Sequence, residues 1–108
     1  MKKVYVASPV AHYIGVYGKK QGINYVRRHA LEVSKQVKEL GHIPISLPLM
    51  FCGVYSESKE RDLAMRAGLI ILSVCDAFAY RKCDLILSEG MREELEEARL
   101  RKMEIIEL

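Results

Sequence analysis

The chain has 108 residues, of which 50% are hydrophobic and 29% charged, and its formal net charge is +3. This length fits one domain over residues 1–108, with the composition of an ordinary soluble globular protein. Basic residues are spread along the chain, which argues against a nucleic-acid partner but allows small anionic ligands. The longest apolar run, residues 68–75, is too short to cross a bilayer, so we expect no membrane partner.

Three cysteines, Cys52, Cys75 and Cys83, lack the spacing of zinc ligands, and we predict neither a metal nor a cofactor. An odd number of cysteines without a signal peptide predicts a reducing, cytoplasmic location. Each cysteine is expected to be a small buried or half-buried side chain.

The first half of the chain predicts a strand, a loop, a helix and a second strand. An apolar run from Val4 to Ala7 predicts the strand, and the glycines and tyrosines of residues 10–22 predict the loop. Residues 23–40 have the apolar spacing of a helix, which Gly41 ends. Residues 42–49 predict a short strand at a sheet edge, because they contain two prolines.

The second half predicts two more helices and two more strands. After a loop, charged and apolar residues from 59 to 74 favour a helix, although residues 69–74 alone could form a strand. Residues 76–80 predict a strand, an acidic helix runs from Ser88 to about Arg101, and residues 103–108 predict a last short strand.

This order of elements predicts an α/β fold. We expect a small doubly wound, flavodoxin- or Rossmann-like parallel sheet of about four strands, with helices on both faces. Ligands of such sheets bind beyond the carboxyl ends of the strands. Three predicted loops meet there: residues 8–13, 47–56 and 81–91.

The start of the acidic helix has the features of an anion site. Ser88 is placed to cap it, and Gly90 lies in its first turn, where glycine costs about 1 kcal/mol relative to alanine. Free amides and the positive end of the helix dipole favour an anion there. An ordinary capped helix has the same pattern, so both interpretations stay open.

One glutamate of this helix differs from the others. Met91, Leu95 and Ala98 share the face that must be buried. Glu94 lies three residues after Met91 and four before Ala98, on the shoulder of that face, whereas the glutamates at positions 93, 96 and 97 point away from it. Glu94 is therefore the one placed for chemistry, or else a shoulder residue paired with a nearby basic side chain.

Three segments resemble the nucleoside 2-deoxyribosyltransferase superfamily: "VYVASP", "DAFAY" and "SEGMREELEEA". The most similar branch is a small domain of unknown function with an S-x-G-M-x-x-E signature, and the resemblance extends over nearly the whole chain. It implies that Glu94 is a nucleophile that attacks the anomeric carbon of a nucleoside. It also implies that Ser88 and the helix start bind a 5′-phosphate and that Tyr5 positions the nucleophile.

The residues implied in ligand or phosphate binding are Ser8, Ser88, Glu89, Gly90 and Met91. The family usually has an aspartate on the preceding helix, and Gly68 stands at that position here. The nearest acidic residue of that helix, Asp62, is the substitute candidate and completes a catalytic set with Glu94 and Tyr5.

Other polar residues have weaker patterns. His29 is placed off the apolar stripe of its helix, and His29 and His42 are expected at the surface. His12 and Tyr13 could contact a base, Asp76 could bond to backbone, and Arg61 and Arg81 are possible phosphate partners or solvated arginines.

The function expected from the resemblance is cleavage or exchange of the N-glycosidic bond of a (deoxy)nucleoside or its 5′-monophosphate. Two alternatives stay open: a non-catalytic nucleotide-binding module of the same fold, and an enzyme acting on another ribosyl compound such as NAD. Apolar residues on several faces of the 59–74 helix predict a homo-oligomer, most simply a dimer.

Overall fold

A four-stranded parallel sheet is the centre of the fold. The computed structural model describes residues 1–51, 54–56 and 59–108. The strand order is β2-β1-β3-β4, and every neighbouring pair is parallel. The strands are β1 (Lys3–Val6), β2 (Ile43–Ile45), β3 (Ala77–Tyr80) and β4 (Glu104–Glu107). The predicted α/β fold is thus confirmed, including the edge position of the proline-containing strand.

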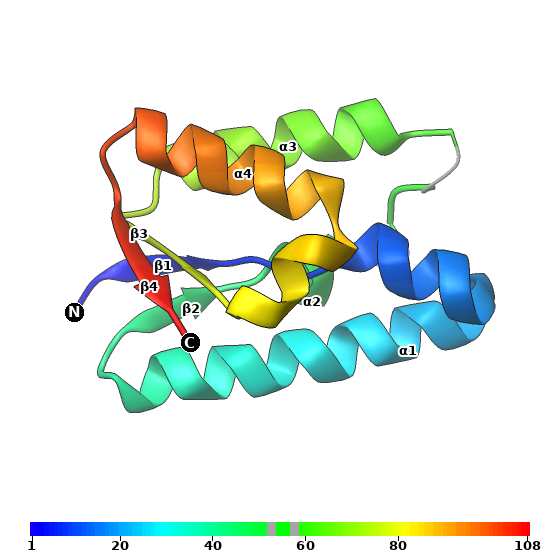
Figure 1. Cartoon of the computed structure of the whole chain (residues 1–108), viewed down its shortest axis with the longest axis horizontal. Helices are drawn as coiled ribbons and strands as arrows, with labels where there is room; N and C mark the ends of the chain where they lie inside the picture. Colours follow the sequence, from blue (N-terminus) through cyan, green and yellow to red (C-terminus); the bar gives the residue numbers. More distant parts are fainter. Residues whose placement is uncertain (52–53, 57–58) are drawn as a thin grey trace.

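Helices cover both faces of this sheet (Figure 1). On one face lies α1 (Val10–Glu39), and on the other lie α3 (Arg61–Ser73) and α4 (Glu89–Leu100). Alternation along β1 explains the division, because Val4 packs in the cluster with Val33 and Val37 of α1, whereas Tyr5 packs in the cluster with α3 and α4. The choice of a helix for residues 59–74 is confirmed.

The chain reverses its direction of winding at β1. From β1 it crosses to β2 on one side, and from β2 it returns to β3 on the other side of β1. In open α/β sheets, this switch point leaves a crevice between the diverging connections, outside the carboxyl ends of the strands. The crevice here lies beyond the ends of β1 and β3.

The prediction of a loop for residues 10–22 is wrong. Helix starts at Val10, and its single non-helical residue is Gly18, with φ of 81° and ψ of 167°. Glycine adopts this conformation without steric strain, and the turn lets residues 10–17 fold back over the helix that follows (Figure 1). Backbone at Ile14 approaches Gly22 so closely that a β-carbon there would lie 2.6 Å from the Ile14 Cα.

We expect Gly22→Ala to destabilise the protein by about 1–3 kcal/mol, because the new methyl group must push the backbone of residues 13–14 away. Gly15→Ala is the matched control. A β-carbon at Gly15 meets no atom within 4 Å, and alanine in a helix interior is favoured by roughly 0.5–1 kcal/mol. Urea denaturation of both variants measures the difference, and equal stabilities would contradict the close approach.

The strand predicted for residues 42–49 is shorter than expected. It ends at Ile45, and Leu47–Phe51 forms a short helix, α2. The second proline is tolerated there because the first turn of a helix needs no amide donor. Residues 82–87, expected as a loop, form a 3-10 helix. Cys52 lies outside the described residues, while Cys75 is buried and Cys83 is exposed.

Helix α3 exposes several apolar side chains on its outer surface. Leu72 is fully buried, Leu69 and Ile71 are half-buried, and Ile70 is 66% exposed. Leu63 and Val74 are also exposed. None of the helices in the described part of the chain has the length and apolar character to cross a membrane.

We therefore expect the protein to form a dimer through α3, because an exposed apolar surface of this kind is typical of an interface. Light scattering at micromolar concentration should give twice the monomer mass, and Ile70→Glu should give the monomer. Leu31→Glu is the control, since Leu31 is also exposed but lies on α1, across the sheet. A wild-type monomer, or equal behaviour of the two variants, would refute this interface.

Candidate active-site cavity

A cavity of about 150 Å³ lies at the switch point, beyond the carboxyl end of β1. Its walls come from five parts of the fold: the end of β1, the start of α1, α2, the first half of α3, and the start of α4. The residues that line it include Tyr5, Ser8, Lys19, Arg61, Gly68, Ser88, Gly90, Met91 and Glu94. A cavity of this size holds one ring-sized group.

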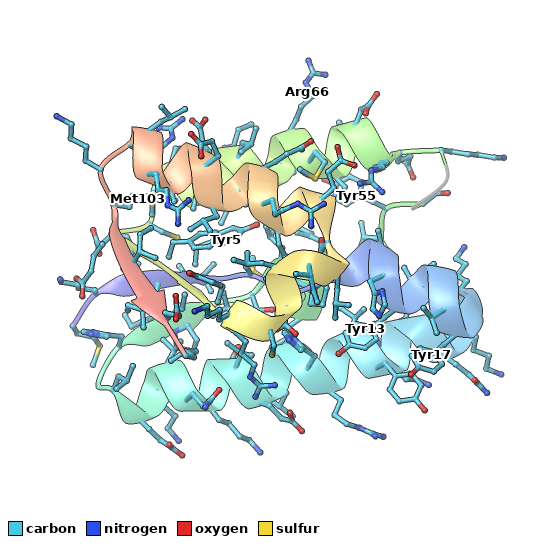
Figure 2. The ribbon with its side chains drawn as sticks, in the orientation of Figure 1. Tyr5, Tyr13, Tyr17, Tyr55, Arg66 and Met103 are labelled. Atoms are coloured by element: carbon cyan, nitrogen blue, oxygen red, sulfur yellow. The ribbon has the colours of Figure 1, made fainter. Side chains whose placement is uncertain are left out.

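Glu94 and Tyr5 form the polar pair of this cavity. The Tyr5 hydroxyl donates a hydrogen bond to Glu94 Oε2, which joins β1 to α4. Tyr5 lies in the interior beneath α4 (Figure 2), and its ring stacks on Phe78 at 5.6 Å. Packing thus fixes the tyrosine, and the tyrosine fixes the carboxylate. The predicted shoulder position of Glu94 is confirmed, because Met91, Leu95 and Ala98 are buried and Glu94 is half-buried.

Burial changes the acidity of both groups. Desolvation raises the pKa of Glu94 to about 7, the hydrogen bond from Tyr5 lowers that pKa in part, and the neighbouring Glu93 charge raises it. Desolvation, and then the Glu94 charge, raise the pKa of Tyr5 well above its usual range. Tyr5 therefore stays a donor, while Glu94 changes its charge near neutral pH. A proton-exchanging group with a pKa near 7 is typical of functional sites.

Gly68 leaves room beside this pair. A β-carbon at Gly68 would lie 3.4 Å from the Tyr5 hydroxyl oxygen and 3.7 Å from Glu94 Oε2. Gly68, the position for which the resemblance predicts an aspartate, thus lies next to the Glu94 carboxylate. With glycine there, α3 contributes no second carboxylate at this point, and the Glu94 carboxylate is open to a ligand.

The start of α4 forms another part of the wall. Ser88 caps the helix, and its Oγ accepts a hydrogen bond from the Met91 amide at 3.2 Å. The cap predicted from sequence is confirmed. The amides of Glu89 and Gly90 precede the first intrahelical bonds and have no acceptor in the described chain. Since Gly90 lines the cavity, these donors lie at its edge.

Two basic residues line the same cavity, Lys19 from α1 and Arg61 from α3. Lys19 follows the Gly18 turn, so the fold-back of α1 brings its side chain to the cavity. Arg81, the other arginine singled out in the sequence, is instead engaged with α1, through Glu32 at 3.6 Å and Gln36 at 3.3 Å.

Two predicted site residues lie elsewhere. Asp62 and Glu89 are exposed and, together with Glu93, line a neighbouring surface depression that shares Arg61 with the cavity. Asp62 lies about 1.7 turns before Gly68 on α3, which turns it away from Glu94. The structure therefore does not bring Asp62 to the cavity as a substitute for the missing aspartate, and only the backbone amide of Glu89 lies near the cavity edge.

His29 was expected at the surface, and this prediction is wrong. It is 5% exposed, and its ring bonds to both Ser8 and Asp84. The signal was present in the sequence, because His29 lies three residues after Val26 and four before Val33, on the buried face of α1. His12 and His42 are half-buried, and Asp76 accepts a hydrogen bond from the Lys3 amide at 2.9 Å, as expected of a backbone partner.

The comparisons with known proteins identify a family. Residues 2–108 match the model of a family described as a domain of unknown function (DUF7768). No curated protein and no solved structure matches the chain. The resemblance to deoxyribosyltransferases and the roles that it implies thus stay predictions, which the geometry of the cavity must support.

Proposed function

The chain belongs to the DUF7768 family, and we propose that it cleaves or exchanges the N-glycosidic bond of a nucleoside 5′-monophosphate, with Glu94 as the nucleophile. The observation that carries this proposal is the hydrogen bond between Tyr5 and Glu94 in the wall of the cavity. It holds one carboxylate in a fixed rotamer, partly desolvated and facing an opening of the size of one ring.

The proposed reaction has two steps. An oxygen of ionised Glu94 attacks the anomeric carbon as the bond between that carbon and the base nitrogen breaks, and the base leaves with the bonding electrons and takes up a proton. The transition state resembles an oxocarbenium ion, which the adjacent carboxylate stabilises. Water then hydrolyses the glycosyl ester, or a second base attacks it and completes an exchange.

The charges at the cavity favour a nucleotide over an uncharged nucleoside. The amides at the start of α4, with Lys19 and Arg61, provide donors and positive charge for a phosphate. When the phosphate is bound at this edge of the cavity, the sugar of the same ligand extends toward Glu94. Since a cavity of about 150 Å³ holds a single ring, we expect the other parts of the ligand to extend through the opening.

The experiment is a panel of the common nucleoside 5′-monophosphates and their 2′-deoxy counterparts, incubated with the protein and analysed for free base by chromatography. Release of base from at least one nucleotide supports the proposal. Binding without release supports the second candidate, a nucleotide-binding module. That candidate is favoured by Gly68, since a reaction that needs a second carboxylate beside Glu94 finds none on α3 at this position.

We also expect an anion at the start of α4. A crystal soaked with sulfate or with a nucleoside monophosphate should show density beside the amides of Glu89 and Gly90, which have no acceptor in the described chain. Density for the phosphate at another place, with none at these amides, would refute the phosphate position without refuting the role of Glu94.

A further inference from the structure

Three buried polar side chains form a line from the cavity wall into the protein. Ser8, His29 and Asp84 are 8%, 5% and 6% exposed. His29 Nδ1 lies 3.1 Å from Ser8 Oγ, and His29 Nε2 lies 2.6 Å from Asp84 Oδ2. Ser8 lines the cavity, whereas His29 and Asp84 do not, so the line connects the cavity with a part of the molecule that the Glu94 chemistry does not use.

The direction of these hydrogen bonds depends on which nitrogens of His29 carry a proton. An ionised carboxylate only accepts, so the short contact to Asp84 requires a proton on His29 Nε2. In the neutral ring the other nitrogen, Nδ1, then has no proton and accepts from Ser8. With a neutral His29 ring, the Ser8 hydroxyl donates its only proton to Nδ1, and lone pairs alone remain for a group in the cavity.

We infer that Ser8 faces the cavity as a hydrogen-bond acceptor, fixed in this role by His29 and Asp84, and that it selects a donor group of the ligand. A sugar hydroxyl or an N–H group of a base fits this requirement. A dianionic phosphate does not, because its oxygens only accept. The inference rests on the proposed function for the class of ligand, and it separates two ends of the site: Ser8 for a donor group, and the start of α4 for the phosphate.

His29 and Asp84 are positioning residues in this arrangement, since they act through Ser8. Because both side chains are buried, each needs a hydrogen-bond partner, since a buried polar group without a partner destabilises the folded state. The Tyr13 ring lies 6.0 Å from the His29 ring and covers it from the fold-back segment of α1. The fold-back segment of α1, which was predicted as a loop, therefore also covers His29, which was predicted at the surface.

Asp84→Asn tests the direction of the hydrogen bonds with almost no change of shape. An asparagine amide donates to Nε2, which moves the ring proton to Nδ1 and makes His29 a donor to Ser8. The Ser8 proton is then free to face the cavity. An exchange of carboxylate for amide beside a histidine is known to impose the other tautomer. Nitrogen NMR of isotopically labelled histidine distinguishes the two tautomers without a ligand.

We expect His29 to carry its proton at Nε2 in the wild type, in spectra recorded from about pH 7 to about pH 9, and at Nδ1 in Asp84→Asn. A wild-type ring protonated at Nδ1, or at both nitrogens throughout this range, would overturn the inference. A variant that keeps the wild-type tautomer would remove Asp84 from the arrangement.

The ligand contact is measured by calorimetric titration with the nucleoside 5′-monophosphate of the panel that binds most tightly. Ser8→Ala and Asp84→Asn should each weaken binding roughly tenfold or more. Asp76→Asn is the control and should bind as the wild type does, because Asp76 lies at the opposite, amino-terminal end of β3. Unchanged binding in Ser8→Ala would refute the contact. If no nucleotide binds the wild type, the proposed function fails, while the tautomers still decide the direction of the Ser8 hydrogen bond.

Discussion

We expect Glu94→Gln to abolish the proposed base release, with a loss of about 10⁴-fold or more on whichever nucleotide the wild type cleaves. The amide of glutamine cannot form the glycosyl ester and cannot balance the charge of the transition state. The fold should survive, because glutamine has nearly the same shape and its oxygen can accept the hydrogen bond that Tyr5 donates to Glu94.

Glu97→Gln is the matched control on the same helix. Glu97 lies one turn from Glu94 but pairs with Arg101 at 2.8 Å, away from the cavity. Pairs of this kind contribute about 0.3–0.5 kcal/mol to stability, so both the fold and the activity should change little. Chromatography of free base, with all three proteins at equal concentration, measures the effect. Substantial activity in Glu94→Gln, or an equal loss in Glu97→Gln, would show that Glu94 is not the nucleophile.

The second large effect concerns stability and its dependence on pH. Burial raises the pKa of Glu94 from 4.5 to about 7, so the folded state binds this proton more tightly than the unfolded state does. The stabilisation is complete below about pH 4.5 and is lost as pH rises through about 7, which lowers the free energy of unfolding by roughly 3 kcal/mol. Above neutral pH, the protein holds a charged carboxylate in a desolvated place.

Glu94→Gln removes this loss, because the amide does not titrate. We expect the variant to match the wild type near pH 4.5 and to exceed its free energy of unfolding by up to roughly 3 kcal/mol near pH 8. Urea denaturation at both pH values gives the comparison. Asp76 and Glu104, whose pKa values are lowered, are present in both proteins, so their contributions cancel in the difference.

A difference between the two proteins that does not change with pH would contradict the raised pKa of Glu94. So would a variant that is less stable than the wild type near pH 8. A gain in stability together with a loss of base release would mean that the carboxylate is retained for function, at the expense of the folded state.

The helix that carries Glu94 shows what local sequence determines. Its apolar spacing gives the buried face, Ser88 gives its start, and the position of Glu94 on the shoulder follows from the geometry of a single helix. The alternation of strands and helices gives the parallel sheet in the same way, because each element is specified within its own residues and the crossover rule then fixes the handedness.

The helical structure of residues 10–22 could not be predicted from the local sequence, for a physical reason. Glycines there are equally compatible with a loop and with a helix that turns at Gly18. What decides between them is the contact of Gly22 with the backbone of Ile14, which exists only after the two helical segments have packed together. The cavity wall that contains Lys19 depends on the same packing.

By itself, then, the sequence determined the fold class, the sheet edge, and the cap and shoulder of α4, because these depend on residues within one or two turns of each other. Only the tertiary structure decided the surroundings of the cavity. In the chain, His29 is 21 residues from Ser8 and 55 residues from Asp84. The three side chains meet because the ends of β1 and β3 lie side by side above α1. Hydrogen bonds over such separations leave no periodic pattern in the sequence, since each partner is specified by a different element.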